Sequence, residues 1–200
     1  MVDLPTALEY AAFGSSLCSA WLYGKQGIRG PIAGLFTVCL FVAFGYAAGV
    51  YAAIGANVVF AFVHIRNLRN ALENDMERSR AKIAEGINYF VTQAHGAATA
   101  AGWWDNRNID DPAVVPMTLM LMVSELVEAM EGHRKNLMDD KLTNRKQIEV
   151  ELGDAMIRIA DLAGKLGLDL GGAIAEKMEY NVTRPDHKPE NRAGVHGKKY

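Results

Sequence analysis

The sequence predicts an all-α protein: an N-terminal three-helix transmembrane hairpin bundle followed by a C-terminal antiparallel helical bundle. Three observations predict this fold class. Charged residues are unevenly distributed, the apolar N-terminal third exceeds one membrane span, and no segment alternates apolar and polar residues as a half-buried strand does. The 200-residue chain has a formal net charge of −2, so no charge excess indicates a nucleic acid partner.

Charge divides the chain into two regions suited to different solvents. Residues 1–65 contain four formally charged side chains, and the other 40 all follow His64. The four are Asp3, Glu9, Lys25 and Arg29. No charged residue occurs from Gly30 to Val63, and this run is too long for one comfortable membrane span. We therefore expect residues 1–66 to form a transmembrane region.

Glycines divide this apolar region into three expected spans. The segment from Gly45 to Gly49 is a plausible tight turn. The spans are expected at roughly residues 4–23, 31–46 and 49–65. Lys25 and Arg29 then lie on the same side of the membrane as Arg66 and Arg69. The positive-inside rule predicts a multi-pass membrane protein whose soluble domain faces the cytoplasm.

Two alternatives to a simple anchor stay open for this region. One is a buried helical hairpin of a soluble protein. The other comes from Ala20-Trp21-Leu22 before the basic turn and Ile54-Gly55-Ala56-Asn57 in the third span. These residues resemble the three-helix unit of PnuC-type nicotinamide riboside transporters. The resemblance implies a half-unit nucleoside transporter, needing a partner, with an attached nucleotide-processing domain.

The charged remainder predicts a helical connector over residues 67–86 and a helical domain over residues 87–200. Four helices are expected, at about residues 80–101, 114–138, 143–166 and 169–181. Thr143 is the expected N-cap of the third helix, and Gly167 is its expected C-cap. Helices joined by short loops predict an antiparallel bundle.

Two pairs of acidic residues stand out in the second and third of these helices. Glu125 and Glu128 are three residues apart in a segment that is apolar nearly all round, and Glu151 and Asp154 repeat the spacing. Clustered buried carboxylates are costly unless they are neutralised, and hard oxygen ligands are those that Mg²⁺ prefers. The pattern predicts a metal site made by these four acids. The alternative is a pair of solvated acidic helix faces.

The order Glu125-x-x-Glu128, a gap of 22 residues and Glu151-x-x-Asp154 resembles the metal signature of MazG-like all-α NTP pyrophosphatases. The similarity continues through residues 155–185, including Arg158, Asp161, Asp169, Glu176, Tyr180 and Asn181. The resemblance implies Mg²⁺-dependent hydrolysis, with Mn²⁺ as a possible substitute, of a nucleoside or deoxynucleoside triphosphate to a monophosphate and pyrophosphate. It also implies a homodimer or homotetramer. A non-enzymatic helical dimerisation bundle is the alternative.

In this interpretation, Lys177 and Arg184 bind the outgoing phosphates and Asn181 orients a phosphate or a ligand carboxylate. His95 and Trp104 line the pocket for the base, because indole rings stack on bases. The alternative roles are structural. Lys177 and Arg184 would then belong to the cationic end of a helix, and Trp104 would close the bundle. The first helix carries Asn88, Gln93 and His95 and no acid that aligns with the family's pattern, which leaves base recognition open.

Overall fold

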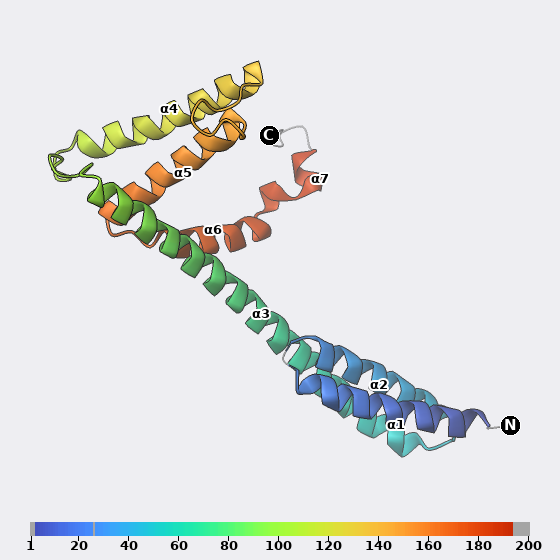
Figure 1. The fold of residues 1–200 in the computed structure, drawn as a ribbon. Helices are drawn as coiled ribbons and strands as arrows, with labels where there is room; N and C mark the ends of the chain where they lie inside the picture. The colour runs from blue at the N-terminus through green and yellow to red at the C-terminus, as the bar shows by residue number, and fades with distance from the viewer. Residues whose placement is uncertain (1–2, 26, 194–200) are drawn as a thin grey trace. The chain divides into compact units, whose positions relative to one another are not determined.

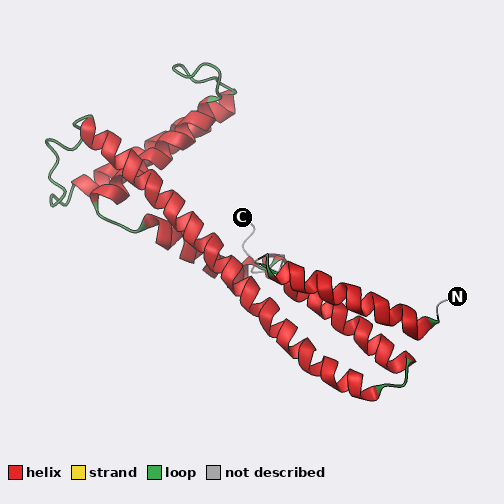
Figure 2. Cartoon of the chain, turned by 60° about the horizontal axis from the view of Figure 1, so that its bottom comes forward, coloured by secondary structure: helices red, strands yellow, loops and turns green. Residues whose placement is uncertain are grey.

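The computed structural model describes residues 3–25 and 27–193, and its regular elements over these ranges are helices (Figures 1 and 2). The elements are α1 (Leu4–Tyr23), α2 (Arg29–Ala47), α3 (Tyr51–Ala100), α4 (Val114–Lys135), α5 (Gln147–Lys165), α6 (Leu170–Thr183), the 3₁₀ turn η1 (Pro185–His187) and α7 (Pro189–Arg192). No strand occurs in the described ranges; Met138 and Lys146 form an isolated bridge. The all-α prediction is confirmed.

The chain divides into two compact units, Met1–Ser79 and Arg80–Tyr200. The predicted connector over residues 67–86 is not a separate element. It belongs to α3, a single helix that contributes residues to both units. The connector contains no proline, and its one glycine, Gly86, is not enough to end a helix.

In the first unit, α1 and α2 pack against each other through small side chains. α1 begins where Asp3 caps it, accepting a hydrogen bond from the Thr6 backbone N–H at 2.9 Å. The buried positions of the two helices are Ala12, Ser19, Gly30, Pro31, Gly34, Thr37, Val38 and Gly45. Large apolar side chains point outward instead, among them Phe13, Leu17, Trp21, Ile32, Phe36, Phe60 and Phe62. The interior of this unit is therefore small and its surface is large and apolar.

The start of α3 is joined to this pair by an aromatic contact. The Tyr23 hydroxyl lies 2.6 Å from Nδ1 of His64, and the two rings stack with centroids 5.8 Å apart. A Cβ atom at Gly34 would lie 2.2 Å from the His64 ring, so only glycine allows this close approach. The three helices thus contact one another through Tyr23, Gly34 and His64.

Among the helices of the described residues, α2 alone is long enough and apolar enough to cross a bilayer. It lies near the N-terminus, and a third of it is buried. α1 carries Glu9 and three serines, and α3 continues into a charged segment. Crossing by α1 and by the start of α3 therefore stays a prediction.

In the second unit, α4 and α5 form a hairpin whose helices lie side by side and run in opposite directions (Figure 1). The opposite side of α5 packs on α3. One cluster joins Val91 and Ala94 of α3 to Ala160 and Ala163 of α5. A second cluster contains Trp104, Val114, Met122 and Leu162. The position of α5 is thus set from two sides.

α6 returns beside α3, and polar contacts hold its first turn. Asp169 caps α6, accepting from the Gly172 backbone N–H at 2.9 Å. The same carboxylate accepts from the Asn88 amide at 2.7 Å, and Asn88 accepts in turn from the backbone N–H of Gly171 at 2.8 Å. Further along, Arg80 pairs with Glu176 at 2.6 Å.

The start of α5 differs from the predicted one because a short polar loop precedes it. α5 begins at Gln147, with Lys146 at its N-cap, so the prediction of Thr143 as N-cap is wrong. Residues 138–146 instead form a loop, closed where the Asp139 backbone N–H donates to the Arg145 carbonyl at 3.0 Å. At the other end the C-cap is Leu166 rather than the predicted Gly167, and Gly167 follows it in the left-handed region, with φ at 63°.

Two glycines inside α5 provide a test of this packing. A Cβ at Gly164 would lie 2.5 Å from Cβ of His95, whereas a Cβ at Gly153 would meet no atom within 4 Å. We expect Gly164→Ala to destabilise the protein by about 1–3 kcal/mol, because α3 and α5 must separate. Gly153→Ala, the matched control, should stabilise it by up to about 1 kcal/mol. Thermal unfolding of the full chain measures both, and equal effects would contradict the contact between the helices.

Candidate metal centre

The seam between α4 and α5 places acids in an interior position. On α4 the buried residues recur every three or four positions: Val114, Thr118, Met122, Glu125, Ala129 and Gly132. This spacing is that of a helix side packed against a neighbour, so Glu125 takes a core position rather than a solvated one. On α5, Glu151 and Ala155 are likewise buried.

Three of the four predicted metal ligands come together at this seam. Glu125, Glu151 and Asp154 can each offer a carboxylate oxygen such that the three atoms lie within 4.8 Å of one another. Glu125 is 6% exposed and Glu151 is 8% exposed, while Asp154 is partly exposed. Glu128 is exposed and lies outside this group of three, although its charge acts on Glu151. We call Glu125, Glu151 and Asp154 the acid cluster.

One cation and one amide are hydrogen-bonded to the acid cluster. Arg158 donates through Nε to Oε1 of Glu125 at 2.7 Å, and Gln147 donates through Nε2 to Oε1 of Glu151 at 3.2 Å. Arg158 is itself 42% exposed, so it neutralises Glu125 from the solvent side. A single guanidinium leaves the cluster with excess negative charge.

Burial and the neighbouring negative charges both raise pKa values in the cluster. Burial raises the pKa of Glu151, and the charges of Glu128 and Glu125 raise it further, while the bond from Gln147 opposes the shift. Burial also raises the pKa of Asp154, with a further contribution from Glu125 and an opposing one from Arg158. Raised values on neighbouring acids are typical of sites that bind a cation or a proton.

Asp139 is a fourth acid close to the cluster, and the sequence reasoning missed it. It is 7% exposed, and its carboxylate accepts from the backbone N–H groups of Lys141, at 3.0 Å, and Leu142. Its charge contributes to the raised pKa of Asp154. An aspartate that starts a polar turn is the sequence signal for such capping. Asp139 thus holds the α4–α5 loop in place beside the acids.

The acid cluster fits the requirements of Mg²⁺. All of its donors are carboxylate oxygens, and they come from two helices that are fixed against each other. Oxygens on opposite sides of Mg²⁺ lie about 4.2 Å apart, because each is about 2.1 Å from the ion. The span of 4.8 Å therefore requires only a small movement of the side chains. Asp154 is partly exposed, so it lies on the solvent side of the cluster.

The predicted phosphate-binding residues gather at the far end of α6. The Lys177 ammonium lies 4.7 Å from the centroid of the Tyr180 ring, and Arg184 donates through Nε to Asp186 at 2.9 Å. Oδ1 of Asn181 is buried without a hydrogen-bond partner among the described residues. No hydrogen bond or ion pair within the described ranges joins Lys177, Asn181 or Arg184 to the acid cluster.

His95 and Trp104 are bound to a common acid. Asp161 accepts from the Trp104 indole at 2.9 Å through the oxygen that lies 2.8 Å from Nδ1 of His95. The two rings meet edge to face, with centroids 6.2 Å apart, and Lys165 lies over the indole at 5.1 Å. Trp104 is buried, so these contacts give it a place in the packing of this unit, and a role of His95 and Trp104 beside the base stays a prediction.

The chain matches no known family model, no curated protein and no solved structure. The resemblances to MazG-like pyrophosphatases and to PnuC-type transporters therefore stay predictions carried by the motif residues. Any argument for function rests on the geometry of the acid cluster.

Removing one charge from the acid cluster should stabilise the metal-free protein. We expect Glu151→Gln to raise the free energy of unfolding at pH 7 by about 0.5–2 kcal/mol, because a buried like charge is lost. Glu149→Gln, on the exposed side of the same helix, is the control. Chemical denaturation measures both, and a less stable Glu151→Gln protein would contradict an excess of negative charge.

The same acids predict a pH dependence. The folded-state pKa values of Glu151 and Asp154 lie above their ordinary values of 4.5 and 3.8. The folded, metal-free chain therefore binds protons more tightly than the unfolded chain. Its stability should rise as the pH falls from neutral through the raised pKa values towards 4.5. In Glu151→Gln, melting temperatures in EDTA should show a smaller rise over this window.

Proposed function

We propose that the Arg80–Tyr200 unit hydrolyses a nucleoside or deoxynucleoside triphosphate to a monophosphate and pyrophosphate in an Mg²⁺-dependent reaction. The acid cluster is the observation that carries this proposal, because three carboxylates converge at a helix seam with one guanidinium to balance them. The spacing of these acids with Glu128 in the sequence is the second support. Divalent metal chemistry on phosphates is the activity that such a cluster suits best.

In the proposed reaction, Glu125, Glu151 and Asp154 hold Mg²⁺, with Glu128 completing the ligand set at the rim. Bound Mg²⁺ supplies positive charge to the phosphate oxygens and lowers the pKa of a bound water. The water oxygen forms a bond to the α-phosphorus and its proton passes to solvent, as the bond from the α-phosphorus to the oxygen that bridges to the β-phosphorus breaks. Pyrophosphate leaves with the electron pair of that bond. Arg158 and Gln147 keep Glu125 and Glu151 oriented toward the ion.

We propose that the α6 end, made of Lys177, Asn181 and Arg184, binds the leaving phosphates. Two of these side chains are cationic, and Asn181 has an unsatisfied amide oxygen. An arginine fork and a lysine ammonium suit phosphate oxygens. His95 and Trp104 are proposed to border the base, although their polar atoms are bonded to Asp161. His95 and Trp104 would then select the nucleotide base through the shape of its pocket rather than through hydrogen bonds.

We propose that residues 1–66 anchor the chain in a membrane with the hydrolase unit in the cytoplasm. The arrangement of small side chains inside and large apolar side chains outside is typical of helices that pack in lipid. Exposed Trp21 lies under the Lys25 ammonium, 3.6 Å from the ring centroid, at the basic end. Exposed Tyr46 and Tyr51 flank the other turn, as aromatic belts do.

Two substitutions test the hydrolase. Glu128→Gln and Asp154→Asn should each reduce pyrophosphate release by at least about 100-fold, since each removes a charged ligand of the metal. Glu149→Gln, which alters an exposed acid that pairs with Arg145, should keep wild-type activity. The assay is a screen of all common ribo- and deoxyribonucleoside triphosphates with Mg²⁺, reading inorganic pyrophosphate.

The screen also decides between the enzyme and a binding bundle. Folding of each variant is checked by helical circular dichroism, so that lost activity is not lost structure. Wild-type rates in both Glu128→Gln and Asp154→Asn would refute the assignment of the acids. Absence of pyrophosphate release with every triphosphate would refute the proposed activity.

Adding charge to the outer surface of the first unit tests the anchor. Full-length chain should stay with membranes after an alkaline carbonate wash. Phe36→Lys combined with Phe62→Lys should release it, because each exposed phenylalanine would face lipid and each lysine costs about 2.5–3.5 kcal/mol there. Met76→Lys, exposed on α3 beyond the predicted spans, is the control. Wild-type chain in the soluble fraction would contradict the anchor.

A further inference from the structure

The outward side of α4 is apolar and uncovered. Its seam side packs on α5, yet the opposite side carries six large apolar residues, each 44–61% exposed. We call them the α4 face: Leu119, Met120, Val123, Leu126, Val127 and Met130. A helix that is apolar nearly all round is normally buried on all sides. In this unit α4 has a packing partner on one side only among the described residues.

The size of the α4 face sets it apart from scattered surface residues. Six adjacent, half-exposed apolar side chains make a patch on the order of 500 Å², the size at which exposed patches on soluble domains mark interaction sites. α5 also carries exposed Leu152, Met156 and Ile159, spaced as one side of that helix. Exposed apolar area of this kind favours association with another surface.

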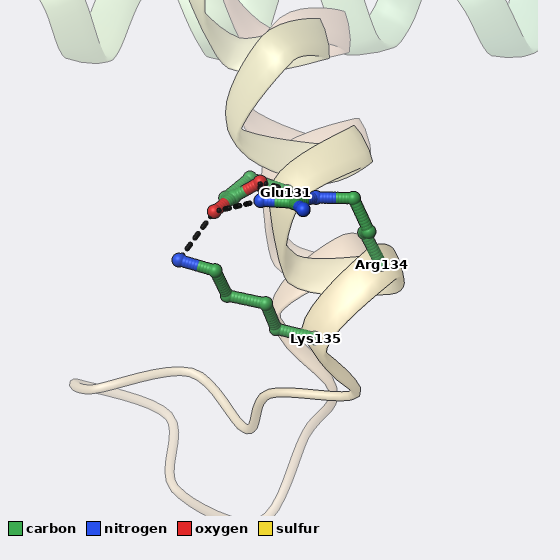
Figure 3. Close-up of polar contacts among 3 residues, drawn as sticks. All are labelled: Glu131, Arg134 and Lys135. Atoms are coloured by element: carbon green, nitrogen blue, oxygen red, sulfur yellow. Dashed lines mark hydrogen bonds and ion pairs between the residues drawn. The ribbon is translucent and has the colours of Figure 1, made fainter.

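We propose that the α4 face binds the α4 face of a second copy of the chain, with the two helices antiparallel about a two-fold axis. The charges at the two ends of α4 are complementary. Asp110 and Asp111 precede the helix, whereas Arg134 and Lys135 end it around a single acid, Glu131 (Figure 3). Antiparallel pairing brings the acidic end of one helix to the basic end of the other, and it also pairs opposite ends of the helix dipoles.

The position of the α4 face along the helix also favours the antiparallel arrangement. Leu119 is the sixth residue of α4 and Met130 is the sixth from its end, so the face is centred on the helix. An antiparallel pair with full overlap then sets Leu119 opposite Met130 of the second copy, and Val123 opposite Leu126. A parallel pair would instead place Arg134 and Lys135 of both copies together, and like charges repel. This inference does not rest on the proposed hydrolase activity.

Cysteine cross-linking of the full chain tests the arrangement. Cys18 and Cys39 are replaced by alanine, and Leu119→Cys and Met130→Cys are made in two differently tagged chains. The two chains are co-expressed, extracted in mild detergent and oxidised. The antiparallel pair predicts a mixed-tag disulfide dimer as the main product. Neither single-cysteine chain alone should give more than a small fraction of that yield, because equivalent positions lie about 16 Å apart along the helix.

Each possible result decides the matter. A dimer from Leu119→Cys alone, in a yield equal to the mixed pair, would mean a parallel arrangement and overturn the proposal. No disulfide dimer in any combination would also overturn it. In a second experiment, Val123→Asp with Leu126→Asp should weaken self-association at least tenfold, measured by light scattering. Met178→Asp, an exposed apolar position of α6, should leave it unchanged.

Discussion

The close approach of Glu125 and Glu151 across the α4–α5 seam is the constraint that the packing of the second unit has to overcome. Two acids that are less than a tenth exposed, with Asp154 beside them, oppose the association of the helices unless a cation is near. Arg158 supplies one positive charge. The helices stay together because the alanines and larger apolar residues around the acids pack well, on the seam and on the opposite side of α5. The fold thus tolerates an electrostatic cost at one place, which is typical of functional sites.

Much of the helical architecture could be predicted from local signals. The predicted first span coincides with α1 because Asp3 caps its start and Gly24 follows its end. The acids of the cluster could be found because a spacing of three puts two carboxylates on one side of a helix. That spacing could not show that Glu128 is exposed while Glu125 is buried. Which of two neighbours on a helix meets the seam depends on the rotation of α4, which packing on α5 decides.

Other features depend on tertiary contacts or loop geometry that the sequence pattern does not reveal. The start of α5 follows from a loop closed by Asp139, whose carboxylate binds backbone groups rather than solvent. The bonds of His95 and Trp104 to Asp161 could not be predicted, because Asp161 lies 66 and 57 residues away in the sequence. The polar residues 67–86 continue α3 because nothing in them stops a helix, and a polar composition alone does not mark a helix boundary. Composition describes solvent exposure better than it describes where helices end.

The two units are built on opposite principles. Large apolar side chains cover the outside of the first unit, whereas the second unit encloses carboxylates in its interior. Divalent cation binding at the acid cluster is the claim on which the functional account depends. Calorimetric titration of the full chain with Mg²⁺ tests it most directly. The account predicts saturable binding to the wild-type chain that is lost in Glu125→Gln and kept in Glu149→Gln. Equal binding by all three chains, or no binding by the wild type, would contradict it.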